Sequence, residues 1–271
     1  MSERFSVYHV PNPLTPLYAL GSAILGRCVH SGDPLGPPWP KYFAPHIPDH
    51  PARASVYGFH ATMVAPFRSK VPAETLAGTL DSVTLGTDAF DLGPLEVSLL
   101  EPGFPALVPK RVPRALTDLE ERLVKTFSAL SLPIEPDDLA RREPLTVRQR
   151  ALAKKWGYPY VLDQFRYHLT LGDPLTEKEE GMGRDRLNYL DLLRSLLTGE
   201  VTSGLRLDSL CLCRQASRGA PFRVISVSGF RPGQEPRPQG DEARPCDDIA
   251  PDRLERPYAP EFSEADLPGL K

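Results

Sequence analysis

Two stretches of the sequence, YGFHATMVAPF and FRYHLTLG, each place a histidine two residues before a threonine. Alternate residues of a β-strand project from the same face. His60 and Thr62 therefore share one face of a strand, and His168 and Thr170 share one face of another. The residues that point the other way are apolar. Each stretch is expected to be a strand with an apolar back on the core and a polar front available for chemistry.

The two polar fronts carry the groups that hydrolysis of a phosphodiester requires. A neutral imidazole accepts a proton from water, and a protonated imidazole donates one to the leaving oxygen. We expect His60 and His168 to be this catalytic pair, with Thr62 and Thr170 binding phosphate oxygens. Arg166 shares a face with His168 and would offset the charge of the transition state. The set predicts cleavage of a cyclic phosphodiester without a metal or another cofactor.

Single motifs of this kind are weak evidence, because a histidine in a core strand usually has only a packing role. Two copies on strands of similar character are much more specific.

Two tyrosines are further candidates for substrate binding: Tyr57 as a hydrogen-bond donor and Tyr158 as a platform for a base or ribose. Core packing is the alternative for both. Gly58 lies on the side of His60, where a missing side chain is expected to leave room for a ligand.

The other histidines and cysteines form no recognisable metal site. Cys211 and Cys213 are too closely spaced for the usual zinc or redox motifs, and packing on one strand face is their expected role. His46 and His50 lie in PHIPDHP, whose prolines exclude a regular helix that would bring the two rings together. His9 has no partner that the sequence identifies. We therefore predict no metal.

Composition excludes several classes of function. The chain has 271 residues, of which 41% are hydrophobic, and a net charge of −3. This charge argues against a general nucleic-acid binder but allows a small anionic ligand. P-loop, dinucleotide-binding and G-x-S-x-G motifs are absent from the sequence. Since it shows neither a secretory leader nor an apolar run of about 20 residues, we expect a soluble, cytoplasmic protein.

Hydrophobic periodicity and turn residues predict the elements that position the motifs. The N-terminus reads as a strand and a helix, followed by a Pro-rich loop over residues 31–55. RALTDLEERLVKTFSAL is the clearest amphipathic helix. Further helices are expected at 71–86, at 146–157 and from Thr176, and short strands at AFDLG, LEVSLL and FPALVP. LRLDSLCLCRQ and FRVISVSGF read as two closing strands.

This order predicts an α+β domain over residues 1–230, built from two halves in which the motif strands occupy comparable places. Residues 231–271 differ in composition, with eight prolines, six basic and ten acidic residues, and few apolar ones. Such a segment lacks the hydrophobic surface that offsets the entropy lost on ordering. We predict that this acidic tail is disordered.

The paired motifs resemble those of the two-histidine phosphoesterase superfamily, which includes RNA cyclic phosphodiesterases and the proteins called 2′-5′ RNA ligases. More closely, YGFHATMVAPF, QRALAKKWGYPYVLDQFRYHLTLG and APFRVISVSGF are similar to a bacterial family called domain of unknown function 1045, whose members are associated with phosphonate metabolism. The resemblance covers about residues 4–230.

The resemblance implies a bilobal α+β fold, with two pseudo-symmetric antiparallel-sheet lobes and flanking helices around a central cleft. It implies metal-independent making or breaking of phosphoester bonds, with His60 and His168 as acid and base and with Thr62 and Thr170 as phosphate ligands. Val64 departs from the pattern, because a lysine is expected at this position.

Two hypotheses from different classes follow. The first is a phosphoric diester hydrolase that acts on a small ribose or nucleotide cyclic phosphate, in phosphonate metabolism. The alternative is a non-catalytic protein that binds a phosphorylated metabolite or a short RNA end, which Val64 and the lack of basic surface favour. Retention of both histidines favours the enzyme. A membrane partner is not expected.

Overall fold

The structure, a computed structural model, describes residues 3–39, 51–142, 144–175, 182–199, 204–231 and 244–245. The helices are α1 (Pro16–Leu25), α2 (Ala54–Tyr57), α3 (Ala73–Leu85), α4 (Arg114–Leu130), α5 (Pro136–Ala140), α6 (Val147–Trp156) and α7 (Met182–Leu196), with the 3-10 helix η1 at Leu162–Gln164. The strands are β1 (Arg4–His9), β2 (Ala61–Phe67), β3 (Phe90–Asp91), β4 (Leu95–Leu100), β5 (Phe104–Pro109), β6 (Arg111–Val112), β7 (Leu169–Thr170), β8 (Arg206–Leu207), β9 (Ser209–Gln215), β10 (Arg223–Gly229) and β11 (Arg244–Pro245).

Local sequence signals explain where several helices begin and end. The hydroxyl of Thr15 accepts the backbone N–H of Tyr18 at the start of α1, with Pro16 at the first helical position. Thr146 and Gln149 form a reciprocal capping box at the start of α6. These signals and the apolar stripe of α4 confirm the helices expected there.

The first sheet has the strand order β10-β9-β1-β2, and all its pairs are antiparallel. Strand β2 follows the first motif histidine, and Thr62 lies opposite Tyr8 of β1. Ala61 and Met63 are buried, whereas Thr62 and Val64 are partly exposed. The predicted apolar back and polar front of this strand are confirmed.

The second sheet has the order β4-β5-β7, again antiparallel, and contains the second motif. Thr170 of β7 lies opposite Ala106 of β5. Within the described part of the chain, β2 and β7 each form one edge of their sheet. The two motifs therefore occupy matching positions in an α+β fold with two antiparallel-sheet lobes.

The lobes do not correspond to consecutive halves of the chain, which corrects the expectation of two sequential halves. The two closing strands return to the first sheet, where β9 pairs with β1 and β10 pairs with β9. The alternating apolar residues of β9 and β10 suit a strand in either sheet, so the sequence pattern did not indicate which sheet these strands join.

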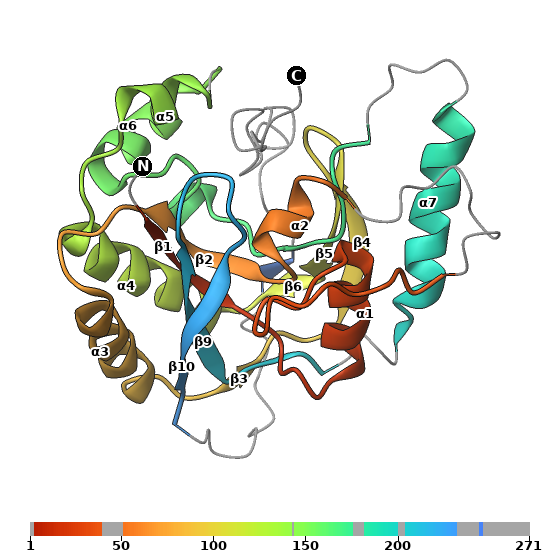
Figure 1. The fold of residues 1–271 in the computed structure, drawn as a ribbon, viewed down its shortest axis with the longest axis horizontal. Helices are drawn as coiled ribbons and strands as arrows, with labels where there is room; N and C mark the ends of the chain where they lie inside the picture. The colour runs from red at the N-terminus through yellow and green to blue at the C-terminus, as the bar shows by residue number, and fades with distance from the viewer. Residues whose placement is uncertain are drawn as a thin grey trace.

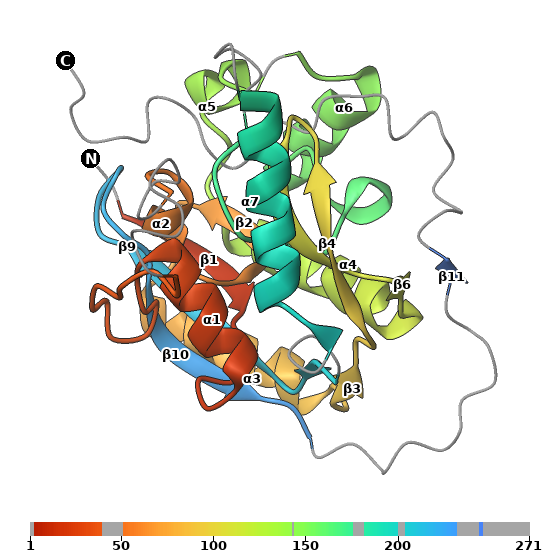
Figure 2. The same cartoon turned by 90° about the vertical axis from the view of Figure 1, so that its right-hand side faces the viewer.

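Helices cover the two sheets from different sides (Figure 1). α3 and α4 lie against one face of the first sheet, where they contact β9, β10 and β2. α7 packs beside β4 of the second sheet, as the rotated view shows (Figure 2). A continuous apolar core, which includes side chains from both motif strands, joins the lobes.

Several predicted features lie wholly or partly outside the residues that the structure describes. They include His46 and His50 in the Pro-rich loop, the expected helix start at Thr176, and most of residues 231–271. Arg244 and Pro245 form β11, which pairs with β6, while the predicted disorder of the acidic tail stays a prediction. In the described ranges no helix combines the length and apolarity that crossing a bilayer requires.

Candidate active site

The backbone just before the first motif strand fixes the orientation of the His60 ring. Nδ1 of His60 lies 2.8 Å from the carbonyl oxygen of Gly58. A carbonyl oxygen only accepts hydrogen bonds, so Nδ1 carries the proton in this contact. Nε2 is then the atom left for proton transfer, and it lies 3.1 Å from the hydroxyl oxygen of Thr62.

The second motif repeats this arrangement. Nδ1 of His168 lies 2.9 Å from the carbonyl oxygen of Arg166, which is again two residues earlier in the chain. The same tautomer is therefore assigned to both imidazoles, with the proton on Nδ1 and a lone pair on Nε2. His60 and His168 are 5% and 7% exposed, so their rings are held in largely closed surroundings.

Aromatic side chains pack against both imidazoles. The ring of Tyr8 lies 3.7 Å from that of His60 between centroids, and the nearly parallel ring of Tyr57 lies 6.3 Å away. Phe104 packs at 5.5 Å from the ring of His168. These contacts restrict the side-chain rotamers, as a preorganised acid and base require.

A buried hydrogen bond brings the two motifs together. Nδ1 of His9 lies 2.5 Å from the hydroxyl oxygen of Tyr167. His9 is paired with Ala61 of β2, directly after His60, and Tyr167 directly precedes His168. One side-chain contact therefore joins the strand beside the first motif to the segment of the second.

A carboxylate forms a second connection between the two motif segments. Asp173, three residues after Thr170, accepts the backbone N–H groups of Arg53 and Ala54 at 2.8–3.2 Å. These residues start α2, which leads through Tyr57 to His60. The sequence analysis identified neither Asp173 nor the partner of His9, since both contacts join residues more than 100 positions apart.

Arg27 holds the segment before the first motif in place. Its buried guanidinium donates to the backbone carbonyls of Ser55, Val56 and Phe222, each at 2.9 Å. These three bonds fix the turn that carries Gly58 relative to the first sheet.

The expectation that Gly58 leaves room for a ligand is wrong. A Cβ atom at this position would lie 2.7 Å from the Cβ atom of Val29, with the Arg27 guanidinium at 3.3 Å. Protein side chains already fill the space. Glycine is required here for a different reason: its φ of 74° lies in the left-handed region, which lets the chain turn into the motif strand.

The remaining predicted site residues lie in different surroundings. Thr170 is 8% exposed beside His168, and Arg166, partly buried, supplies the carbonyl that orients His168. Tyr57 is 2% exposed and stacks between His60 and Phe222. The roles of these three residues in substrate binding stay predictions, as does the central cleft.

Tyr158 lies in a second, smaller hydrophobic cluster with Ala65 of β2. Its ring is nearly perpendicular to that of Tyr160, and the guanidinium of Arg142 lies 5.0 Å above it. Tyr158 also lines a groove with Val64, Arg142 and Trp156, and the residues that line this groove include neither motif histidine. The groove begins on β2 beyond Thr62, so a substrate contact of Tyr158 requires a ligand that extends along this strand.

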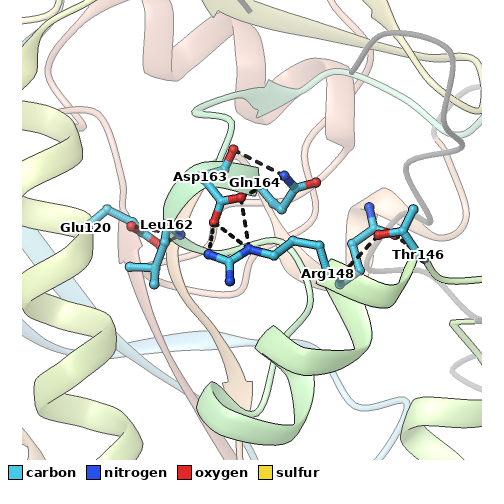
Figure 3. A network of polar contacts seen from close by, with 7 residues as sticks. Glu120, Thr146, Arg148, Leu162, Asp163 and Gln164 are labelled. Carbon is cyan, nitrogen blue, oxygen red and sulfur yellow. Dashed lines mark hydrogen bonds and ion pairs between the residues drawn. The ribbon is translucent and has the colours of Figure 1, made fainter. Parts of the chain in front are cut away.

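A polar network holds the segment that leads into the second motif (Figure 3). The buried carboxyl group of Glu120 on α4 accepts the backbone N–H of Leu162, whose φ of 57° is unusual for a residue with a side chain. Two guanidinium nitrogens of Arg148 bond the carboxylate of Asp163. The Arg148 charge and its hydrogen bonds lower the pKa of Asp163.

The Glu120 carboxyl predicts a dependence of stability on pH. Burial raises its pKa to about 8, and the nearby charges of Glu121 and Asp163 add to the rise. Ionisation therefore favours the unfolded chain, in which this carboxyl titrates near 4.5, so stability is lost as pH rises from 4.5 towards 8. Relative to wild type, Glu120→Gln is expected to gain on the order of a few kcal/mol in unfolding free energy at pH 8.5 but little at pH 4.

Chemical denaturation of both proteins at the two pH values measures this difference. Gln keeps an oxygen that accepts the Leu162 N–H, so the variant isolates the charge. Equal effects of the substitution at pH 4 and pH 8.5 would contradict the assignment.

The cysteine pair has the predicted packing role. Cys211 and Cys213 are both buried on β9, on the face that also carries Tyr8 of the neighbouring strand. Burial raises the pKa of Cys211 to about 12 and holds that of Cys213 well above its usual value, so both thiols are protonated at neutral pH. Among the described residues there is no group of three or more His, Cys, Asp or Glu side chains arranged to hold a metal ion.

Comparison with known sequences identifies a family. The model of a family described as "Protein of unknown function (DUF1045)" matches residues 62–223. This match covers more than half of the chain and runs from Thr62 in β2, through the segment of the second motif, to Arg223 at the start of β10.

Two curated relatives carry the same name, ribose 1,5-bisphosphate phosphokinase PhnN. The protein from Laribacter hongkongensis (strain HLHK9) is 33% identical over 178 residues, which are 64% of this chain and 41% of the relative. The protein from Janthinobacterium sp. (strain Marseille) is 30% identical over 227 residues, 81% of this chain and 49% of the relative. The chain thus spans less than half the length of either relative.

Similar solved structures include E. coli LigT in complex with 3′-AMP, at 13% identity and a TM-score of 0.40, with 86% of this chain and 100% of that chain covered. A structure described as a phosphoesterase has the same identity of 13%, the same TM-score of 0.40 and the same coverage of both chains. E. coli LigT in complex with ATP has 14% identity and a TM-score of 0.38, over 86% of this chain and 98% of that one.

Proposed function

The chain belongs to the DUF1045 family, and we propose that it is a metal-independent phosphoesterase that hydrolyses a small cyclic phosphodiester. The observation that carries the proposal is the matched orientation of two histidines. In both motifs Nδ1 is bonded to the carbonyl oxygen two residues earlier, which leaves Nε2 for chemistry. A purely structural role does not require the same tautomer twice, directly before two strands that lie at the edges of separate sheets.

The proposed reaction uses the two Nε2 atoms on opposite sides of phosphorus. The neutral imidazole takes a proton from water as the water oxygen bonds to phosphorus, and the protonated imidazole gives its proton to the ring oxygen as that P–O bond breaks. The product is a phosphomonoester. Thr62 and Thr170 donate to the non-bridging oxygens, and the side chain of Arg166 offsets the added negative charge.

The substrate class that we propose is a cyclic phosphate of ribose. Both curated relatives are named for ribose 1,5-bisphosphate. Hydrolysis of a 1,2-cyclic phosphate of ribose 5-phosphate at the bond to O2 produces this compound. Because the present chain has no P-loop sequence and matches less than half of each relative, we assign it the hydrolysis and not the kinase step. Such a reaction would belong to the cytoplasm and, by the family resemblance, to phosphonate metabolism.

The second candidate function is non-catalytic binding of a phosphorylated metabolite or RNA end. It is favoured by Val64, where a lysine was expected, because the site then has one cation fewer. A binder needs donors for phosphate but no acid and base of complementary protonation states.

The test is turnover by EDTA-treated protein of ribose 1,2-cyclic phosphate with and without a 5-phosphate, nucleoside 2′,3′-cyclic phosphates, and short RNAs with cyclic ends. We expect hydrolysis of the ribose compounds, seen by ³¹P NMR as conversion of a cyclic diester to a monoester. Saturable binding of any of these compounds with no product would overturn the hydrolase in favour of the binder. Faster turnover of RNA ends would reassign the substrate class.

A further inference from the structure

We propose that His9 and Tyr167 form a positioning pair that sets the separation of the two catalytic histidines. This inference rests on the proposed function, since it assigns a task within the same site. The pair is not part of either motif, and neither residue is placed to touch the substrate.

The location of the pair supports this role. His9 lies on β1 opposite Ala61, and Tyr167 is the residue before His168. Both side chains are on the apolar back of the motifs and are almost completely buried, at 1% and 3% exposure. The bond therefore crosses from the first lobe to the second directly behind the two reactive rings.

The two groups form a bond between neutral partners. Burial lowers the pKa of His9 to about 3, so its ring is neutral at physiological pH. Burial also raises the pKa of Tyr167 well above its usual value. Nδ1 of His9 and the hydroxyl oxygen of Tyr167 lie 2.5 Å apart, and the bond needs no net charge at either end.

A buried polar pair is harder to accommodate in a core than an apolar pair, so its presence here indicates that the geometry of the bond has a role. Burying an imidazole and a phenol requires that both be hydrogen-bonded, whereas aliphatic side chains of similar size would pack without that condition. A hydrogen bond restricts distance and angle, which packing alone restricts less. In-line chemistry at phosphorus is sensitive to displacements of about 1 Å, which reduce rates by as much as 10²-fold.

Asp173 limits movement at the other end of the segment. Asp173, which bonds the Arg53 and Ala54 N–H groups, follows Thr170 in the sequence, whereas Tyr167, which bonds His9, precedes His168. The second motif is consequently attached to the first lobe on both sides. Loss of the His9–Tyr167 bond leaves the Asp173 contact intact, so the lobes stay together while the histidine separation becomes less restricted.

The variant Tyr167→Phe tests the proposal, because it removes only the hydroxyl. We expect kcat for the cyclic phosphate to fall about 10- to 100-fold, with KM changed less than about threefold, since the phosphate ligands remain. Tyr189→Phe is the matched control: it also removes a buried hydroxyl, which donates to the carbonyl of Leu171 within the second lobe. Its kcat is expected to stay within about twofold of wild type.

His9 offers an independent test of the same bond. Asn places an amide group, which can donate or accept a hydrogen bond, near the position of Nδ1, so His9→Asn should retain more activity than His9→Leu. Equal kcat for the wild type and Tyr167→Phe, or equal losses in Tyr167→Phe and Tyr189→Phe, would overturn the positioning role.

A readout that does not need turnover separates this inference from the proposed function. In ¹⁵N-histidine spectra, Tyr167→Phe should shift the ring signals of both His60 and His168, and Tyr189→Phe should shift neither. An inactive wild type that still shows this pattern would reject the hydrolase but keep the positioning pair. Unchanged signals in Tyr167→Phe would reject the pair whatever the activity.

Discussion

Replacement of either His60 or His168 by alanine is expected to lower kcat on a cyclic phosphate by about 10²–10⁴-fold, the usual contribution of a positioned acid or base. Each imidazole holds Nδ1 on a backbone carbonyl, and in the proposed reaction both Nε2 atoms act on the same phosphate. Because both groups act in one step, the double variant should be little slower than either single variant. Steady-state kinetics of the three proteins measure the effect.

Asparagine variants separate chemistry from folding. The amide N–H of Asn at position 60 or 168 can still donate to the carbonyl of Gly58 or Arg166, while Nε2 is lost. We expect His60→Asn and His168→Asn to melt close to wild type and to be as inactive as the alanine variants. Turnover within tenfold of wild type by either asparagine variant would contradict the acid and base assignment.

Replacement of Gly58 by alanine is expected to have the largest effect on stability, a loss of about 2–4 kcal/mol in unfolding free energy. Two causes add. The φ of 74° is strained for any residue with a Cβ atom, and that atom would overlap Val29 at 2.7 Å. The carbonyl of Gly58 orients His60, so the variant should also lose activity where it remains folded.

Gly78→Ala is the control for this substitution. Gly78 lies within α3, and a Cβ atom added there would meet only open space. Alanine there should increase stability by about 0.5–1 kcal/mol, because glycine is unfavourable inside a helix. Urea denaturation of both variants provides the comparison, and a Gly58→Ala protein as stable as wild type would show that the turn accommodates a side chain.

Local sequence signals were sufficient for the parts of the fold that local interactions determine. The leucine spacing of residues 114–130 predicted α4 with its observed ends. Strict alternation placed Thr62 on the front of β2, and His60, directly before this strand, points to the Thr62 hydroxyl. The repeated motif also indicated two comparable strands, which the structure places at the edges of two sheets.

Contacts between distant residues were not predictable in the same way. A single histidine such as His9 carries no signal for a partner 158 residues away. The role of Gly58 was misjudged because Val29, which fills the space beside it, is distant in sequence. Pairing of β9 with β1 was likewise not indicated, since alternation defines the faces of a strand but not its neighbour.

The most direct test of a shared site for the two histidines is a titration of ¹⁵N-histidine-labelled protein with ribose 1,5-bisphosphate, the product of the proposed hydrolysis, followed by NMR. We expect the Nε2 signals of His60 and His168 to shift along one saturation curve, while their Nδ1 signals keep the signature of hydrogen-bonded N–H groups. A response from only one of these histidines, or two curves with different midpoints, would contradict a single phosphoester site between them.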